Sequence, residues 1–116
     1  MEHAARGARA AGGLTVGLLP GEDTDEANPY IDIAIATGLG HARNAIVALT
    51  ADGVVALGGG LGTLSEIALA VRNRRPAVGI QTWRFDRPGR TEPVLPTAAN
   101  PKEALDWLFA HMSGAS

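Results

Sequence analysis

The sequence contains no cysteine, which excludes disulfide bonds, thiolate catalysis and cysteine-ligated metals. Aromatic residues make up only 4% of the chain, and Lys102 is its single lysine. No apolar run approaches the roughly 20 residues that a membrane-spanning helix needs. Arg6 and Arg9 occupy the middle of the N-terminal segment, where a secretory signal would place its apolar stretch. These absences predict a cytoplasmic protein that does not interact with a membrane and binds no metal.

The charge balance is nearly even, with a formal net charge of −2. Phosphate backbones recruit clearly basic surfaces, so nucleic acid is not expected as a partner. The hydrophobic fraction of 46% is normal for a globular protein. A chain of 116 residues allows one domain. We therefore expect residues 1–116 to form a single domain, with a mobile tail at residues 113–116.

Short apolar runs alternate with helical patterns along the chain. The runs at residues 14–20 and 54–58 are nearly all apolar, which is typical of strands buried on both faces. The last helix has a complete start signal, because Asn100 is a good N-cap and Glu103 completes a capping box. The predicted strands cover residues 14–20, 31–37, 54–58 and 77–83, and the predicted helices cover 2–11, 41–50, 63–75 and 100–112.

This alternation predicts an α/β domain with a parallel sheet. Residues 21–30 and 84–97 are rich in turn formers or proline and are expected to be loops. In such sheets, ligands bind at the edge formed by the carboxyl ends of the strands. Turns that leave these strand ends are therefore the first candidates for a binding site.

The segment VVALGGGLGTLSE, residues 54–66, is one such turn. Its glycines are Gly58, Gly59, Gly60 and Gly62, followed by Thr63 at the predicted start of a helix. Glycine lets a ligand approach the main chain, and a helix N-terminus adds unpaired N–H donors and partial positive charge. The segment therefore predicts an anion site. A structural alternative stays open, because Thr63 and Glu66 also have capping-box spacing.

Two familiar glycine fingerprints do not match this turn. A Walker loop needs a lysine, and none is present here. The dinucleotide pattern GxGxxG, started at Gly58, meets Thr63 where its last glycine should be.

A second glycine turn, TGLGHARN, covers residues 37–44. Gly38 and Gly40 follow the strand, and Arg43 and Asn44 fall at the start of the next helix. A cation in a first helical turn opposes the helix dipole, and a nearby anion would explain it. The alternative is an arginine that extends into solvent or pairs with an acidic loop residue.

Together the turns predict a cleft that holds Arg43 and Glu66. The arginine would hold a phosphate. The carboxylate would hydrogen-bond ribose hydroxyls or stabilise positive charge at the anomeric carbon. A phosphorylated sugar is the ligand that this pair suits.

The segment LGGGLGTLSE resembles the PGGxGTxxE signature of the LOG-like proteins, which are nucleoside 5′-monophosphate phosphoribohydrolases often mislabelled as lysine decarboxylases. The segments GLGHARN and GGGLGTLSEIALA are more similar to the sibling branch that contains the molybdenum cofactor carrier protein. The resemblance covers roughly residues 1–83 and is most specific at 37–44 and 54–70.

The resemblance implies a Rossmann-like, three-layer fold with helices on both faces of the sheet, and homodimers or higher homo-oligomers. It seats a nucleotide phosphate on Gly59, Gly60, Gly62 and Thr63. The catalytic glutamate of the signature falls on Glu66, and the arginine of the family falls on Arg43.

This sequence departs from the hydrolase pattern at two positions. The proline that opens the signature is Gly58 here, and the lysine after the arginine is Asn44. Both changes point toward the carrier-like branch. Two strands, a helix and a first glycine-rich loop that precede Met1 in these families are absent, so we expect an N-terminally incomplete sheet.

The predicted function is binding of a nucleotide or phosphorylated cofactor, with phosphoribohydrolase activity as an open question. The catalytic residues would be Arg43 and Glu66. The alternative is a non-catalytic carrier of the molybdenum cofactor. No cofactor is required for hydrolysis, while a nucleotide or molybdopterin-type cofactor is the expected bound ligand. The predicted contacts to that ligand come from Gly38, Gly40, Asn44, Gly58, Gly59, Gly60, Gly62 and Thr63.

Overall fold

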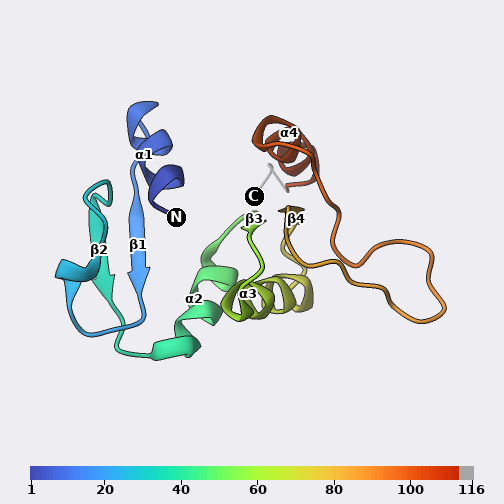
Figure 1. Cartoon of the computed structure of the whole chain (residues 1–116), viewed down its shortest axis with the longest axis horizontal. Coiled ribbons are helices and arrows are strands. Elements are labelled where there is room, and N and C mark those ends of the chain that lie inside the picture. The colour runs from blue at the N-terminus through green and yellow to red at the C-terminus, as the bar shows by residue number, and fades with distance from the viewer. Residues whose placement is uncertain (113–116) are drawn as a thin grey trace. The chain divides into compact units, whose positions relative to one another are not determined.

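A computed structural model describes residues 1–112, so the predicted mobile tail at 113–116 lies outside the described residues. The chain divides into two compact units, unit 1 from Met1 to Arg43 and unit 2 beginning at Asn44. Each unit contains a two-stranded parallel sheet (Figure 1). The predicted α/β class with parallel strands is confirmed. The grouping of both units into one domain stays a prediction.

Unit 1 contains α1 (Glu2–Ala10), β1 (Val16–Leu19) and β2 (Ile33–Ala36). The strands pair in register from Val16 opposite Ile33 to Leu19 opposite Ala36. Burial of β1 on both faces was predicted and is wrong, because half of Val16 is exposed. One helix can cover at most one face of a sheet, and α1 is the only complete α-helix of unit 1. The side chains of β2 alternate between two environments, and Ile33 and Ile35 lie on its exposed side.

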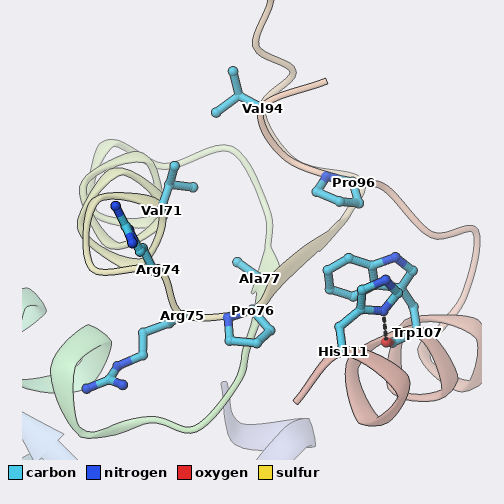
Figure 2. Close-up of a pocket in the computed structure, with 9 residues that line it drawn as sticks. All are labelled: Val71, Arg74, Arg75, Pro76, Ala77, Val94, Pro96, Trp107 and His111. Atoms are coloured by element: carbon cyan, nitrogen blue, oxygen red, sulfur yellow. Dashed lines mark hydrogen bonds between the residues drawn. The ribbon is translucent and has the colours of Figure 1, made fainter. Parts of the chain in front are cut away.

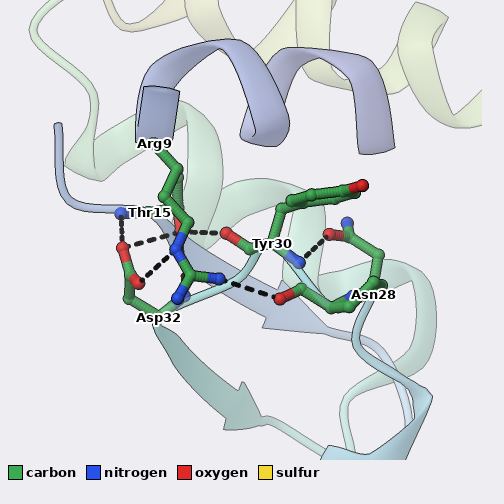
Figure 3. Close-up of polar contacts among 6 residues, drawn as sticks. Arg9, Thr15, Asn28, Tyr30 and Asp32 are labelled. Carbon is green, nitrogen blue, oxygen red and sulfur yellow. Dashed lines mark hydrogen bonds and ion pairs between the residues drawn. The ribbon is translucent and has the colours of Figure 1, made fainter. Parts of the chain in front are cut away.

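A polar network joins the start of β1 to the segment before β2 (Figure 3). The carboxylate of Asp32 accepts from the backbone N–H of Thr15 at 2.9 Å and from its hydroxyl at 3.0 Å. Arg9 forms an ion pair with the same carboxylate at 3.4 Å and donates to the carbonyl of Pro29 at 3.0 Å. These contacts connect α1, β1 and the loop before β2, so they stabilise the fold of unit 1.

We expect Asp32→Asn to destabilise unit 1 at neutral pH and to matter less in acid. The hydrogen bonds from Thr15, with a smaller contribution from Arg9, lower the pKa of Asp32 below its ordinary value of 3.8. A lowered pKa stabilises the folded state above the pKa of the unfolded chain, and this stabilisation is lost as the pH falls through the folded value. Urea unfolding of both proteins at pH 7 and at pH 3 measures this. An equal difference at the two pH values would contradict the prediction.

Unit 2 contains most of α2 (Arg43–Thr50), then β3 (Val54–Leu57), α3 (Leu61–Arg72), β4 (Ala77–Ile80) and α4 (Pro101–His111). The β3–α3–β4 segment is a parallel βαβ unit, with Leu57 opposite Ile80 at the carboxyl ends. Helices α3 and α4 lie on opposite sides of the two strands (Figure 1).

Two apolar clusters fill the two faces of this sheet. One contains Val54, Ala56 and Ala77 of the strands with Ile67 of α3, and the other contains Val78 and Ile80 with Ala104 and Leu108 of α4. Successive residues of β4 therefore point to opposite faces, and all of β4 is buried. The predicted arrangement of helices on both faces is present within unit 2.

The structure confirms the predicted start of α4 and corrects the predicted end of β4. The capping of α4 is confirmed, because the Asn100 side chain accepts from the N–H of Glu103 at 2.8 Å. The Glu103 carboxylate accepts from Ala99 at 3.0 Å, one residue before the N-cap. The extension of β4 to residue 83 is wrong, since the strand ends at Ile80. Gln81 has a φ of +47°, which no strand allows.

Candidate functional site

The glycine turn of unit 2 connects β3 to α3 at the carboxyl end of the strand. It consists of residues 58–60, all of them exposed, and Gly58 has a φ of +83°. A Cβ atom built on Gly58, Gly59 or Gly60 would meet nothing within 4 Å. The space over these glycines is therefore open, so a ligand can approach the main chain there.

Side-chain donors from the same unit hold two carbonyl groups of this turn and the carbonyl of the residue before it. The Thr63 hydroxyl donates to Leu57 O at 3.4 Å, and the Thr82 hydroxyl donates to Gly58 O. The Trp83 indole N–H donates to Gly60 O at 3.1 Å. In a trans peptide the C=O and the following N–H point in opposite directions. The N–H groups of Gly58, Gly59 and Leu61 are thus directed away from these side chains.

The amide groups of this turn are available for an added acceptor. Within residues 1–112, the N–H groups of Gly58, Gly59 and Gly60 donate no hydrogen bond. The first turn of α3 contains no acidic residue. The first N–H groups of a helix have no intrahelical partner, and they carry the positive end of the helix dipole. Such a row of donors fits a phosphate or another oxyanion.

The structural alternative for Thr63 and Glu66, a capping box, is wrong. Helix α3 begins at Leu61 with Gly60 as its N-cap, and no side chain caps it. Gly60 has extended φ and ψ angles, and Leu61 and Gly62 already follow the helical path, so the helix starts two residues earlier than predicted. Glu66 consequently lies in the second turn of α3, where a carboxylate cannot cap the first N–H groups.

Asn44, the second residue of α2, is buried although its side chain is polar. It is 1% exposed, and its Oδ1 atom has no hydrogen-bond partner among the described residues. A Cβ atom on Gly62 would lie 3.9 Å from Asn44 Nδ2, which places this amide beside the first turn of α3. Buried amides are nearly always paired, because an unpaired one costs about 1–3 kcal/mol.

The other predicted turn, at residues 37–43, belongs to unit 1. Gly38 and Gly40 have φ angles of +65° and +58°, which explains why glycine occupies both positions. Their N–H groups donate to Gly21 O and Pro20 O, each at 2.9 Å. Arg43 is the first residue of α2 and so lies in its first turn, as predicted, although the helix starts two residues later than expected. The ligand contacts predicted for Gly38, Gly40 and Arg43 stay predictions, as does a cleft shared by the two turns.

Sequence reasoning missed Thr82 and Trp83. Both were assigned to a strand, although they lie after its end and donate to carbonyls 24 and 23 residues away. The signal that could have exposed them is their place at the carboxyl end of β4, beside the glycine turn.

A separate pocket of about 340 Å³ lies at the amino end of β4, the end opposite the glycine turn (Figure 2). Its walls include Pro76, Ala77 and Arg74, together with Trp107 stacked on His111 at 4.0 Å. None of the predicted site residues lines it. In residues 1–112 no cluster of His, Asp or Glu is arranged to hold a metal ion. No helix in this range is long and apolar enough to span a bilayer.

The sequence of this chain was compared with the models of known protein families. Residues 1–105 match the SLOG cluster4 family. The chain belongs to this family. Both glycine turns lie within the matched residues, so the predicted relationship to LOG-like and carrier-like proteins is confirmed.

One relative of this SLOG cluster4 chain is an uncharacterised protein of Archaeoglobus fulgidus. It is 43% identical over 95 residues, which include 76% of this chain and 62% of the relative. This chain thus spans less than two thirds of that protein.

The solved structures that are similar to this chain include two proteins that bind or carry the molybdenum cofactor. The molybdenum cofactor binding protein of Rippkaea orientalis superposes with a TM-score of 0.82 at 39% identity, covering 95% of this chain and 69% of that protein. The molybdenum cofactor carrier protein of Chlamydomonas reinhardtii has a TM-score of 0.71 at 37% identity, covering 92% and 69% of the two chains. These similarities confirm the Rossmann-like fold class.

Proposed function

We propose that this protein binds a phosphorylated small molecule on the glycine turn before α3, and that a molybdopterin-type cofactor is its ligand. The observation that carries the proposal is the open main chain of residues 58–60, whose N–H groups are exposed and donate no hydrogen bond in residues 1–112. A phosphate monoester offers the acceptor oxygens and negative charge that this helix start favours. The similar proteins of R. orientalis and C. reinhardtii, which bind or carry the molybdenum cofactor, support the choice of ligand.

In this proposal the residues of α3 bind and orient, and they perform no chemistry. The N–H groups of Gly58 to Leu61 would donate to the phosphate oxygens, with those of Gly62 and Thr63 continuing the row of donors. Asn44, whose Nδ2 lies beside Gly62, also keeps its predicted binding role as part of the proposal. Arg43 and the turn at Gly38 and Gly40 keep their predicted binding roles as part of the proposal. Homo-oligomers and a cytoplasmic setting also stay predictions.

Anaerobic titration with molybdenum cofactor released from a molybdoenzyme tests the proposal. Saturable binding is expected, together with a higher unfolding temperature. A ligand at 100 times its Kd adds about 2.7 kcal/mol to the free energy of unfolding. AMP and inorganic phosphate serve as comparison ligands. Absence of stabilisation by all three would overturn the proposal.

Phosphoribohydrolase activity is the second candidate function, and the position of Glu66 favours it. This carboxylate lies in the second turn of α3, the helix that follows the glycine turn. It would stabilise positive charge on the ribose or activate water, while Arg43 would orient the nucleotide.

We expect Glu66→Gln to abolish hydrolysis of AMP while leaving binding nearly unchanged, if the chain is a hydrolase. Loss of the carboxylate removes charge stabilisation in the transition state, and effects of about 100-fold or more are usual for such groups. Release of free adenine, followed by chromatography, measures the reaction. Glu103→Gln is the matched control, since Glu103 belongs to the cap of α4. If the wild-type protein binds the cofactor but releases no adenine from AMP, the hydrolase function is excluded and only the carrier function remains.

A further inference from the structure

We propose that residues 81–83, the support segment, position the glycine turn for its ligand, with Thr82 and Trp83 as positioning residues. This inference rests on the proposed function of the same turn. Neither residue needs to touch the ligand. Their role is to fix the direction of peptide groups that would otherwise rotate freely.

The first evidence is the pair of hydrogen bonds that leave the support segment. Thr82 Oγ1 donates to Gly58 O, and Trp83 Nε1 donates to Gly60 O at 3.1 Å. Glycine peptides rotate easily, because no Cβ restricts them. A rotated peptide would present a carbonyl oxygen to an anion in place of an N–H group. The two bonds prevent this at the peptides that follow Gly58 and Gly60.

The second evidence is the unusual backbone that the support segment needs. Gln81 has a φ of +47°, which is rare for a residue with a side chain. Such conformations persist only where surrounding contacts hold them, and they concentrate at functional sites. Here the departure from the strand at Gln81 is what turns Thr82 back toward Gly58. A regular continuation of β4 would send alternate side chains to opposite faces instead.

The third evidence is the space reserved for Thr82. A Cβ atom on Gly79 would clash with Thr82 Cγ2 and would lie 2.9 Å from Leu95 Cδ2. Gly79 is also held on its other edge, since its N–H donates to Pro96 O at 2.9 Å and its carbonyl accepts from Ala98 N at 2.8 Å. Thr82 therefore packs on a fixed backbone, which gives its hydroxyl a defined position.

The test uses the full chain with Thr82→Val, which removes the donor but keeps the shape, and Thr82→Ser, which keeps the donor. Amide ¹⁵N relaxation reports the order of the Gly59 and Leu61 N–H groups, and calorimetry reports the Kd for AMP. We expect Thr82→Val to lower the order parameter of Gly59, whose peptide it no longer holds, from about 0.85 toward 0.6. It should also weaken AMP binding about tenfold, a usual effect of losing one hydrogen bond. Thr82→Ser should keep both values near wild type.

Each outcome decides the inference. Unchanged order parameters in Thr82→Val would overturn it whether or not a ligand binds, and so would a loosened turn with unchanged affinity. If wild-type protein binds none of the three ligands, the proposed function fails and relaxation alone decides the role of the support segment. If Thr82→Val does not fold, Trp83→Phe removes the other donor, and the order parameter of Leu61 is then expected to fall and AMP binding to weaken.

Discussion

Gly59→Val is expected to weaken binding of the phosphorylated ligand by at least about 100-fold, or roughly 2.7 kcal/mol, while the protein stays folded. A Cβ at this position meets no protein atom within 4 Å, and the backbone of Gly59 does not have a positive φ. The new side chain therefore costs the free protein little. It would instead occupy the space over the N–H groups that the phosphate needs. Calorimetric titration with AMP or the cofactor measures the loss, and thermal unfolding confirms the fold.

Gly7→Ala is the matched control for this prediction. Gly7 also has open space around its Cβ position and lies in the interior of α1, outside every predicted site. Alanine there should raise stability by about 0.5–1 kcal/mol, because glycine is unfavourable inside helices. Ligand affinity should not change. If Gly59→Val and the wild-type protein bind the ligand with equal affinity, the glycine turn is not the binding site.

Gly79→Ala is expected to lower the free energy of unfolding by about 2 kcal/mol. Its Cβ would clash with Thr82 Cγ2 and crowd Leu95 Cδ2, and overpacking of a buried position costs about 1–3 kcal/mol. Leu95 is 2% exposed and belongs to the core cluster on the α3 face, so it has little room to move. Urea unfolding followed by circular dichroism measures the change.

The double variant Gly79→Ala/Thr82→Ser separates the two contacts. Serine lacks the Cγ2 atom but keeps the hydroxyl that donates to Gly58 O. We expect it to restore about half of the lost stability, since the crowding of Leu95 remains. A strictly additive double variant would mean that Thr82 is not what the new Cβ meets, because contacting residues couple and distant ones do not.

The helix starts show what a sequence can predict from local signals. Asn100 and Glu103 were identified as a cap from spacing alone. The Asn100 side chain accepts from the N–H of Glu103, and the Glu103 carboxylate accepts from the N–H of Ala99, just before the N-cap. The same reasoning failed at Thr63 and Glu66, although the spacing is identical. At α3 the glycines allowed the helix to begin earlier, and Thr63 bonded to Leu57 O instead. Capping spacing is predictive only where the preceding residue cannot itself begin the helix.

Burial was harder to predict than secondary structure. Val16 lies in an apolar run typical of a buried strand, yet unit 1 leaves it about half exposed. Asn44 was expected at a polar turn, and it is buried beside Gly62. An apolar run indicates only that a segment can be buried, not that it is buried in the folded chain. What covers it depends on neighbours that are distant in sequence.

The sequence by itself determined the α/β class, the parallel βαβ unit around the glycine turn and the family, because these depend on periodicity and on motifs a few residues long. Only the tertiary structure decided how the turn is held. Thr82 and Trp83 reach Gly58 and Gly60 because β4 lies beside β3 and because Gln81 leaves the strand at its end. That contact depends on strand pairing across more than 20 residues, and no local pattern encodes it. The glycines provide the open main chain, and the fold determines which way its N–H groups point.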